Sequence, residues 1–406
     1  MRSPLPFLLV TLFLDAMGIG IVYPVMPDLI AEIEGVTVGG AALWGGVLAT
    51  AYAVMQFLCA PVLGAVSDRF GRRPVLLLSL AVMAVDYVGS ALAQSMGVLL
   101  LLRLLAGVTA ATHATCNAVA ADLTPPDKRA QTFGLLGAAF MGGFILGPVI
   151  GGLLGELGPR APFWAAAAMA ALNLLFGWWA LPETVTDATR RPLEWRRANP
   201  LGAFRSVGRL RGALPLLLVL FLTELAFTSY VVIWAYWGKA AFGWSPFEIG
   251  LSLAAFGIAA VWAQGYGIRL YLRLLGERGT IVLGFACSLL FFVLFAALPS
   301  NELGGLLALL LCPLSALGEV ILPALQARIS RLAPPDAQGE ALGVVASTRS
   351  AAHVGGPIVM TAIFAWGASV PGGHLYGAPY ALGAVLMVLC LVLFRRTLEP
   401  EPAPAT

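Results

Sequence analysis

Four acidic side chains lie inside long apolar stretches of this 406-residue chain: Asp15, Asp86, Glu224 and Glu319. Ionisable groups at membrane depth are costly and are therefore candidates for function. Asp15 and Glu224 have no obvious basic residue at their depth, so each can hold a proton in one state and a cationic solute in another. The alternative for each is a protonated carboxyl bonded to a helix carbonyl. We predict that the four acids and Arg103 take part in proton coupling.

Two of these acids have an arginine at a similar depth. A rise of about 1.5 Å per residue places Asp86 about 18 Å and Arg103 about 21 Å from the same membrane face. We therefore predict an ion pair between antiparallel neighbours, with a static salt bridge of no functional role as the alternative. The same estimate brings Glu319 close to the depth of Arg349, which predicts a second pair provided that both side chains face inward.

Further polar and aromatic residues in the apolar stretches can line a cavity. His113 and His353 can bind a solute or relay protons, and a hydrogen-bonded packing role is the alternative for both. The predicted lining residues are Tyr52, Gln56, His113, Asn117, Tyr230, Trp234, Trp262, Gln264, Gln326, Arg349 and His353. Aromatic and amide side chains also pack between helices, which is the alternative for the others. Tyr236 and Trp237 are instead predicted to anchor a helix end at the membrane interface.

The composition shows which elements must position these residues. Hydrophobic residues make up 59% of the chain, charged residues 11%, and the mean hydropathy is +0.88. Soluble domains have about 45–50% apolar and about 25% charged residues, so a water-soluble enzyme is excluded. The net charge is +3 and the basic residues are scattered, which excludes a nucleic-acid-binding or disordered protein. We predict an all-α, polytopic membrane protein.

Several chemistries lack the residues that they need. The five cysteines lie in apolar runs without a Cys-x-x-Cys pair, so neither a disulfide framework nor a metal site is predicted. The absence of a Gly-x-x-x-x-Gly-Lys sequence excludes an ATP-driven pump within this chain. No spacing suits a nucleophile with its base, so we expect neither an enzyme nor a bound cofactor. Charges that form no rings disfavour a channel.

A transmembrane helix needs about 20 apolar residues, and Gly, Pro or charged residues separate runs of that length. Twelve helices are predicted, at 5–27, 41–66, 74–94, 97–121, 131–155, 161–181, 213–238, 246–270, 279–298, 303–328, 339–366 and 376–395. The first contains Asp15 and lacks a small-residue cleavage site, so a retained span is expected rather than a signal peptide. The arginine-rich linker 182–212 separates two halves, 1–181 and 213–406.

Lysine and arginine are strongly biased toward one side of these helices. Of the 24 basic residues, twenty lie in segments on the side of both termini. Arg160 and Lys239 are the two in loops on the other side, and Arg103 and Arg349 lie within spans. Because positive charge accumulates in cytoplasmic loops, both termini are predicted to be cytoplasmic.

The two halves repeat each other at a fixed offset of 209 residues. Pro125-Pro126-Asp127, Gly134 and Gly147-Pro148 recur as Pro334-Pro335-Asp336, Gly343 and Gly356-Pro357. The same offset carries Asp15 onto Glu224. Such duplication is typical of transporters that are built from two parallel halves.

The loop after the second predicted helix reads Gly64-Ala-Val-Ser67-Asp68-Arg69-Phe70-Gly71-Arg72-Arg73. It resembles the signature G-x-x-x-D-R-x-G-R-R of the major facilitator superfamily, which implies two six-helix halves. Its charges can form an ion-pair cluster whose breaking biases one conformation against another. An ordinary positive loop is the alternative. The predicted gating residues here are Gly64, Asp68, Arg69, Gly71, Arg72 and Arg73, with Asp122 as a further partner.

The fifth predicted helix contains Gly143-Phe-Ile-Leu-Gly147-Pro148-Val-Ile-Gly151-Gly152. This run resembles the superfamily's antiporter motif G-x-x-x-G-P-x-x-G-G, which accompanies exporters rather than symporters. Small residues at four-residue spacing give a smooth face for close helix packing, and Pro148 permits a bend. The alternative is a packing face without directional meaning. Gly143, Gly147, Pro148, Gly151 and Gly152 are predicted to contribute to gating.

Other runs are similar to the tetracycline/proton antiporters of that superfamily. They are Leu14-Asp15-Ala16-Met17-Gly18-Ile19-Gly20, Asp86-Tyr87, Arg103-Leu-Leu-Ala-Gly107 and Leu322-Pro323-Ala324-Leu325-Gln326. In those antiporters the positions of Asp86 and Arg103 matter for transport. The chain departs from them at Ser288, where an acid is usual, and at Ala259-Ala260-Val261-Trp262, where a histidine is common. Glu224 and Glu319 are candidates to supply the missing acid.

The resemblance implies a proton-coupled antiporter that exports an amphipathic, tetracycline-like drug across the inner membrane by alternating access. Mg²⁺ would travel with the drug if it binds as a chelate. The alternatives are a multidrug exporter of other cationic or lipophilic compounds, a proton-coupled metabolite symporter, a lipid or siderophore exporter, and a receptor without transport. Spans rich in Leu, Ala, Phe and Trp suit a bulky drug better than a hydroxylated solute. We expect a monomer whose partners are drug, protons and lipid, with no nucleic acid.

Overall fold

The computed structural model describes residues 5–187, 190, 192, 213–332, 338–371 and 375–396. Throughout these residues the regular structure is helical and no strand is formed, which confirms the predicted all-α class. Most of the predicted basic linker, 182–212, lies outside the described residues. A helix satisfies its own backbone N–H and C=O groups in a membrane, so the apolar runs fold as long helices.

The helices fall into two groups along the chain. The amino half contains α1 (Leu5–Val22), α2 (Met26–Glu34), α3 (Val38–Phe70), α4 (Arg72–Leu92), α5 (Met96–Val108), α6 (Thr112–Leu123), α7 (Arg129–Gly155) and α8 (Ala161–Ala180). The carboxyl half contains α10 (Leu214–Thr228), α11 (Trp234–Phe242), α12 (Pro246–Trp262), α13 (Ile268–Ala297), α14 (Glu302–Ser315), α15 (Ile321–Leu332), α16 (Gln338–Ser369) and α17 (Ala378–Arg396).

The described residues contain the predicted twelve membrane crossings. Eleven helical segments among them are long and apolar enough to span a membrane. One of these segments, Pro246–Ala297, has 52 residues, and at Gly276 its backbone turns back with φ 66° and ψ −177°. That conformation is readily available to glycine alone. The segment therefore holds two antiparallel spans, and the total is twelve.

The first, fourth, seventh and tenth spans are interrupted along their length. A 3₁₀ turn at Tyr23–Val25 separates α1 from α2, and a π-helical turn at Ser229–Ile233 separates α10 from α11. α5 and α6 part at 109–111, and a 3₁₀ turn at Ala316–Val320 separates α14 from α15. An offset of 209 carries each amino-half interruption onto its carboxyl-half counterpart, so the repeat extends to the backbone. Transporters place solute and ion sites at such discontinuous spans.

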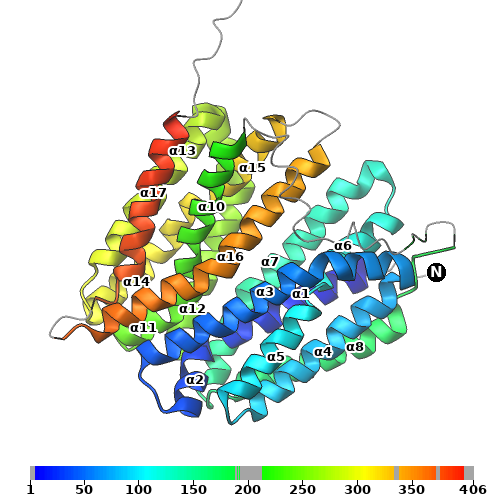
Figure 1. Cartoon of the computed structure of the whole chain (residues 1–406), viewed down its shortest axis with the longest axis horizontal. Coiled ribbons are helices and arrows are strands. Elements are labelled where there is room, and N and C mark those ends of the chain that lie inside the picture. The colour runs from blue at the N-terminus through cyan, green and yellow to red at the C-terminus, as the bar shows by residue number, and fades with distance from the viewer. Residues whose placement is uncertain are drawn as a thin grey trace, which may run out of the picture.

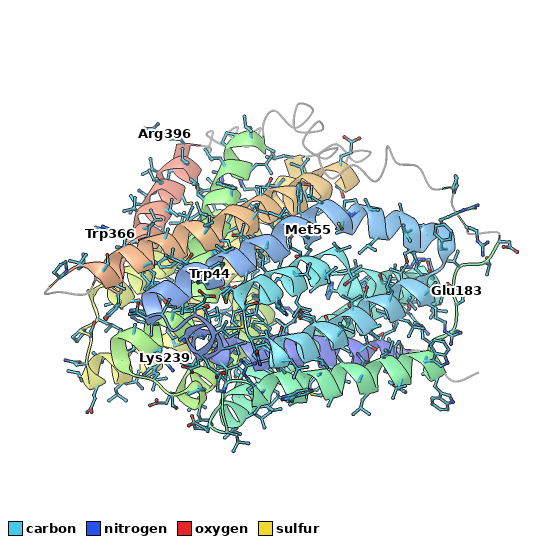
Figure 2. The ribbon with its side chains drawn as sticks, turned by 60° about the horizontal axis from the view of Figure 1, so that its bottom comes forward. Trp44, Met55, Glu183, Lys239, Trp366 and Arg396 are labelled. Atoms are coloured by element: carbon cyan, nitrogen blue, oxygen red, sulfur yellow. The ribbon has the colours of Figure 1, made fainter. Side chains whose placement is uncertain are left out.

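The two halves meet at one face of the molecule and separate toward the other (Figure 1). We call the face that carries the start of α1 and the end of α17 the terminal face, and the opposite one the closed face. Near the closed face α3 lies along α16, and α7 lies along α12. Figure 2 shows Lys239 toward the closed face and Glu183 at the far end of the amino half.

Small residues let the backbones approach along the seam between α3 and α16. A Cβ atom on Gly46 would overlap the hydroxyl of Thr361, and the Thr50 hydroxyl donates a hydrogen bond of 3.2 Å to the Val354 carbonyl. Three glycines toward the terminal face contact no neighbouring helix among the described residues. An added Cβ atom would have no neighbour within 4 Å at Gly64, Gly134 or Gly343.

Polar contacts also join the two halves at the closed face. Lys239 of α11 forms an ion pair with Asp28 of α2. The Glu156 carboxylate, just beyond α7, accepts a hydrogen bond of 3.4 Å from the backbone N–H of Phe247 in α12. The structure therefore shows the halves in contact at the closed face and parted at the terminal face.

The predicted interface anchors Tyr236 and Trp237 are buried instead, at 4% and 2% exposure. Trp237 packs edge-on against Tyr380 of α17 and Phe242, with ring centroids 4.8 and 4.7 Å apart. Tyr236 faces α3 at Gly45, where an added Cβ atom would lie 2.8 Å from its ring. The prediction failed because position along a helix does not reveal which way a side chain points.

Candidate functional site

The amino half holds an acid with no partner beside an acid that has one. Asp15 of α1 is 7% exposed and has neither a hydrogen bond nor an ion pair among the described residues. Asp86 of α4 pairs with Arg103 of α5 through its Oδ2 atom, which confirms the predicted ion pair. Tyr87, the residue after Asp86, lies against α1 one helical turn from Asp15, because a Cβ atom on Gly18 would lie 2.9 Å from its hydroxyl.

The Asp86 carboxylate uses only half of its bonding capacity. Arg103 donates to Oδ2, whereas the buried Oδ1 atom has no hydrogen-bond partner within the described part of the chain. A buried polar atom left without a partner costs about 1–3 kcal/mol. A proton or a solute donor bound at Oδ1 would recover that energy, so this atom is suited to transient binding.

The carboxyl half forms a different pair from the one predicted. Arg349 of α16 contacts Glu224 of α10 rather than Glu319, and His353 contacts the second Glu224 oxygen at 3.2 Å. The expectation that Glu224 lacks a basic partner was therefore wrong. Glu319 instead accepts a hydrogen bond of 3.3 Å from Gln264. Depth along a helix did not decide between the two acids, because α16 packs directly against α10 and turns both basic groups toward it.

An apolar pocket lies between the two halves. Its amino-half lining is Tyr23, Phe144 and Pro148, and its carboxyl-half lining is Tyr230, Val231, Trp234, Leu253, Phe256 and Cys312. Tyr230 stacks near Phe292 with ring centroids 4.8 Å apart. Its hydroxyl is buried without a hydrogen-bond partner in the described residues. The pocket is therefore a small apolar space of about 60 Å³ at the junction of the halves.

Most of the predicted polar lining residues are accessible at membrane depth. Side chains of this kind are costly against lipid, so we expect these positions to face water between the halves. The exposed ones are Gln56, His113, Gln264, Gln326 and His353, while Tyr52, Asn117, Tyr230 and Arg349 are partly buried. The Asn117 amide lies 3.2 Å from His113 Nδ1 one helical turn away.

The two predicted tryptophans lie apart from that polar group. Trp234 is 3% exposed, and its indole N–H donates a hydrogen bond of 2.8 Å to the Ser252 hydroxyl. It contacts the pocket with its ring and belongs mainly to the packed core. Trp262 is 48% exposed on the helical face that also carries Leu251 and Ile258. That face is apolar throughout, unlike the one that presents Gln264.

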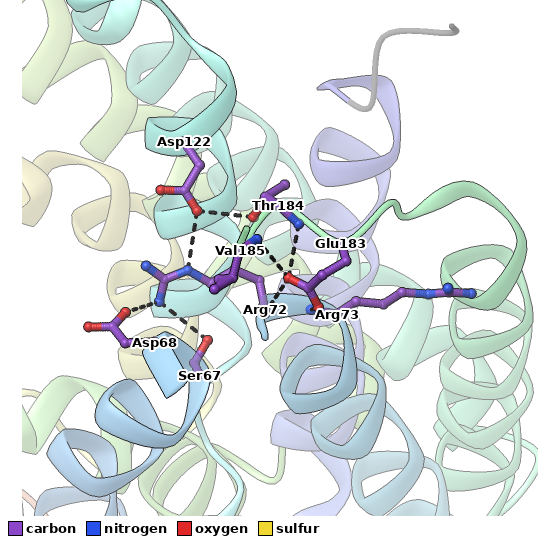
Figure 3. A network of polar contacts seen from close by, with 8 residues as sticks. All are labelled: Ser67, Asp68, Arg72, Arg73, Asp122, Glu183, Thr184 and Val185. Carbon is purple, nitrogen blue, oxygen red and sulfur yellow. Dashed lines mark hydrogen bonds and ion pairs between the residues drawn. The ribbon is translucent and has the colours of Figure 1, made fainter. Parts of the chain in front are cut away.

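The predicted ion-pair cluster at the terminal face is confirmed, and Arg72 is its centre (Figure 3). Arg72 contacts Asp68 at 2.5 Å, Asp122 at 3.3 Å and the Ser67 hydroxyl at 3.3 Å. These residues come from α3, α4 and α6, so the cluster ties three amino-half helices together. Arg69 is exposed and has no partner among the described residues.

Glu183 is a member of this cluster that the sequence analysis missed. Its carboxylate accepts hydrogen bonds from the backbone N–H groups of Arg72 at 2.9 Å, Arg73 at 3.2 Å and Val185 at 2.9 Å. It thereby caps the start of α4, where helix N–H groups lack partners. A Cβ atom on Gly71 (φ 118°) would overlap this carboxylate, which explains the glycine. Glu183 lies shortly after the end of α8 and inside the predicted linker 182–212, where no contact with α4 is expected.

The carboxyl half has a simpler version of the same cluster. Glu277 and Arg331 form an ion pair, and they lie 209 residues after Asp68 and Asp122 respectively. Glu277 also contacts Arg328 at 3.6 Å, so two acids bridged by one arginine in the amino half are replaced by one acid that bridges two arginines. Both halves therefore have ion pairs at equivalent positions, but the arrangement of acidic and basic residues differs.

The antiporter-like run packs α7 against both halves. A Cβ atom on Gly147 would lie 2.6 Å from the Met17 carbonyl of α1, and one on Gly143 or Gly151 would overlap other α1 carbonyls. Gly152 would meet α12 instead, 2.6 Å from the Pro246 carbonyl. The predicted close packing is confirmed, and this helix lies at the junction of the two halves.

Ser288 stands where an acid is usual in the resembled family. It is 2% exposed and lies against Gly318, whose added Cβ atom would overlap the serine hydroxyl. Glu319 is the residue after Gly318. No group of three or more His, Cys, Asp or Glu side chains in the described residues could hold a metal ion.

The profile of the Major Facilitator Superfamily matches residues 8–239 and 216–406. The chain therefore belongs to the Major Facilitator Superfamily, a family of membrane transporters. Within it, the chain groups with the tetracycline resistance proteins. It is 41% identical to the class C protein of Escherichia coli over 97% of both chains, and 37% identical to the class G protein of Vibrio anguillarum over 98% of both.

A solved structure shares the architecture. The nucleoside transporter NupG superposes with a TM-score of 0.81 at 15% sequence identity, covering 99% of this chain and 100% of that one. At that identity the likeness shows the fold alone. The predicted major facilitator fold and the predicted resemblance to the tetracycline proteins are both confirmed, and the chain is a multi-pass membrane protein.

Proposed function

We propose that this chain is a proton-coupled antiporter of the inner membrane that exports tetracycline or a related amphipathic drug. The observation that carries the proposal is Asp15, a buried acid in the first span with no partner in the described residues, beside the Asp86–Arg103 pair. The identity to tetracycline resistance proteins over nearly the whole chain supports the choice of drug. The chain acts as a monomer and converts no substrate chemically.

The exchange follows from competition for the same carboxyl groups. In the proposal the terminal face is cytoplasmic, because the basic loops gather there, and the described conformation is open to the cytoplasm. The drug enters between the halves, alone or as a Mg²⁺ chelate, and its cationic part faces Asp15. After the halves rock to open the closed face, protons take Asp15 and the free Asp86 oxygen and displace the drug. Proton and drug binding therefore oppose each other reciprocally.

Proton flux in proteoliposomes tests this function. Purified protein is reconstituted with a pH gradient, and tetracycline with Mg²⁺ is added on the side of higher pH. We expect drug entry to drive protons in the opposite direction. The Asp15→Asn protein should fold and bind lipid normally but lose this coupled flux, because it cannot exchange a proton at that position.

Each other outcome identifies a different protein. A response to cationic dyes but not to tetracycline would make the chain a multidrug exporter. Drug and protons that move in the same direction would indicate symport. Coupled export that persists in Asp15→Asn would refute the assignment of that residue. A matched control is Asp187→Asn, which changes an exposed carboxyl outside the spans.

A further inference from the structure

Two basic side chains of α16 share one buried carboxylate. The Glu224 side chain is 4% exposed, and its two oxygens contact Arg349 Nε and His353 Nε2. The two basic residues lie one helical turn apart, and their side chains are 43% and 53% exposed. Glu224 therefore contacts Arg349 and His353 through one nitrogen each and leaves the rest of both side chains partly exposed.

Most of the hydrogen-bonding capacity of this pair is unused. A guanidinium has five N–H donors in a planar fork, and Glu224 accepts at Nε. The terminal Nη atoms of Arg349 and the Nδ1 atom of His353 have no partner among the described residues. Such a fork fits the two oxygens of a carboxylate or a similar anion.

The location of this pair suits a ligand site. His353 is the residue before Val354, whose carbonyl accepts the hydrogen bond from Thr50 of α3. The two partly exposed basic groups of α16 therefore lie close to the seam between the halves. The amino half has no counterpart of these two basic residues. The positions 209 residues earlier are Phe140 and Phe144.

We propose that Arg349 and His353 bind an anionic group of the transported molecule. The ligand class is therefore a drug that carries a carboxylate or a similar planar anion. Glu224 is a positioning residue, since it orients the two basic groups without touching the ligand. This inference rests on the proposed function for the presence of a transported drug, and it adds which groups of the drug the carboxyl half recognises.

Two dyes that differ in one group test the recognition of the anion. Rhodamine B carries a carboxylate and a cationic ring system, and its ethyl ester retains the cation alone. Binding of each to the purified full-length chain is measured by fluorescence anisotropy. We expect rhodamine B to bind at least about tenfold more tightly, because charge-assisted hydrogen bonds to the guanidinium are lost in the ester. Equal affinities would overturn the proposal.

Substitutions show which residues cause the tighter binding of rhodamine B. Arg349→Gln should lower the affinity for rhodamine B to that for the ester. Because Arg349→Gln leaves a buried carboxylate unpaired, the double variant Arg349→Gln/Glu224→Gln removes both charges and keeps the test valid if the single variant unfolds. A preference that survives in the double variant would overturn the proposal. Arg395→Gln, at the exposed end of α17, is the matched control.

Failure of this site and failure of the exporter give different results. Drug-driven proton flux with equal dye affinities refutes the recognition site alone. A tenfold dye preference that depends on Arg349, without any coupled flux, refutes the antiport alone.

Discussion

A methyl group added at Gly46 should hold the closed face apart. The Cβ atom of Gly46→Ala would overlap the Thr361 hydroxyl and lie 3.0 Å from the Thr361 Cβ atom and 3.1 Å from the Pro357 carbonyl. The hydroxyl already donates to that carbonyl at 2.8 Å and Thr361 is fully buried, so rotation cannot relieve the overlap. Overpacking of this kind costs about 1–3 kcal/mol. The population with a closed seam should fall by about 5- to 150-fold relative to the other state.

Distances between spin labels on the two halves measure that shift. Labels at Glu34→Cys and Ser300→Cys lie at the closed face, in a background where Cys59 and Cys287 are replaced by alanine. Double electron–electron resonance should show that a longer distance between the two labels dominates in Gly46→Ala. The matched control is Gly97→Ala, another helical glycine, whose Cβ atom would have no neighbour within 4 Å. Identical distance distributions in the two proteins would refute the packing argument.

Two further substitutions test contacts described above. Lys239→Gln removes the ion pair between the halves, and because both side chains are partly exposed the closed face should lose about 0–1 kcal/mol. The same labels should show a modest shift toward the longer distance in Lys239→Gln, and 1 M salt should produce a similar shift in the parent protein. A population change beyond tenfold would contradict this weak role. Ser252→Ala leaves the buried indole N–H of Trp234 unpaired, at a cost of about 1–3 kcal/mol. Its thermal unfolding temperature in detergent should fall by several degrees without a change in label distances, and an unchanged temperature would show that the bond is dispensable.

Features that depend on order along the chain could be predicted from the sequence. The span limits, the 209-residue repeat and the charge cluster around Arg72 follow from spacing and composition, and the structure confirms them. The Asp86–Arg103 pair was also predictable, because consecutive antiparallel spans must be neighbours and equal depth then suffices.

Features that depend on rotation about a helix axis could not be predicted. Arg349 had two acids at similar depth on nonconsecutive spans, and the packing of α16 against α10 selects Glu224. Depth alone could not show that Trp237 points into the carboxyl half rather than toward lipid. Glu183 was missed for another reason: its partners are backbone N–H groups, which leave no mark in the sequence.

The glycines along the closed face also bear on how fast the halves can separate. Without an apolar drive for helix association in lipid, such a seam depends on close backbone contact rather than on interlocking side chains. At Gly46 and Gly250 the contacting surface is bare backbone on one side, so parting requires no bulky side chain to leave a hole or change rotamer. The free-energy barrier to separating the helices along this seam should therefore be low. Because the Lys239–Asp28 ion pair contributes only about 0–1 kcal/mol, the rate of opening should depend mainly on whether the residues along the seam stay small.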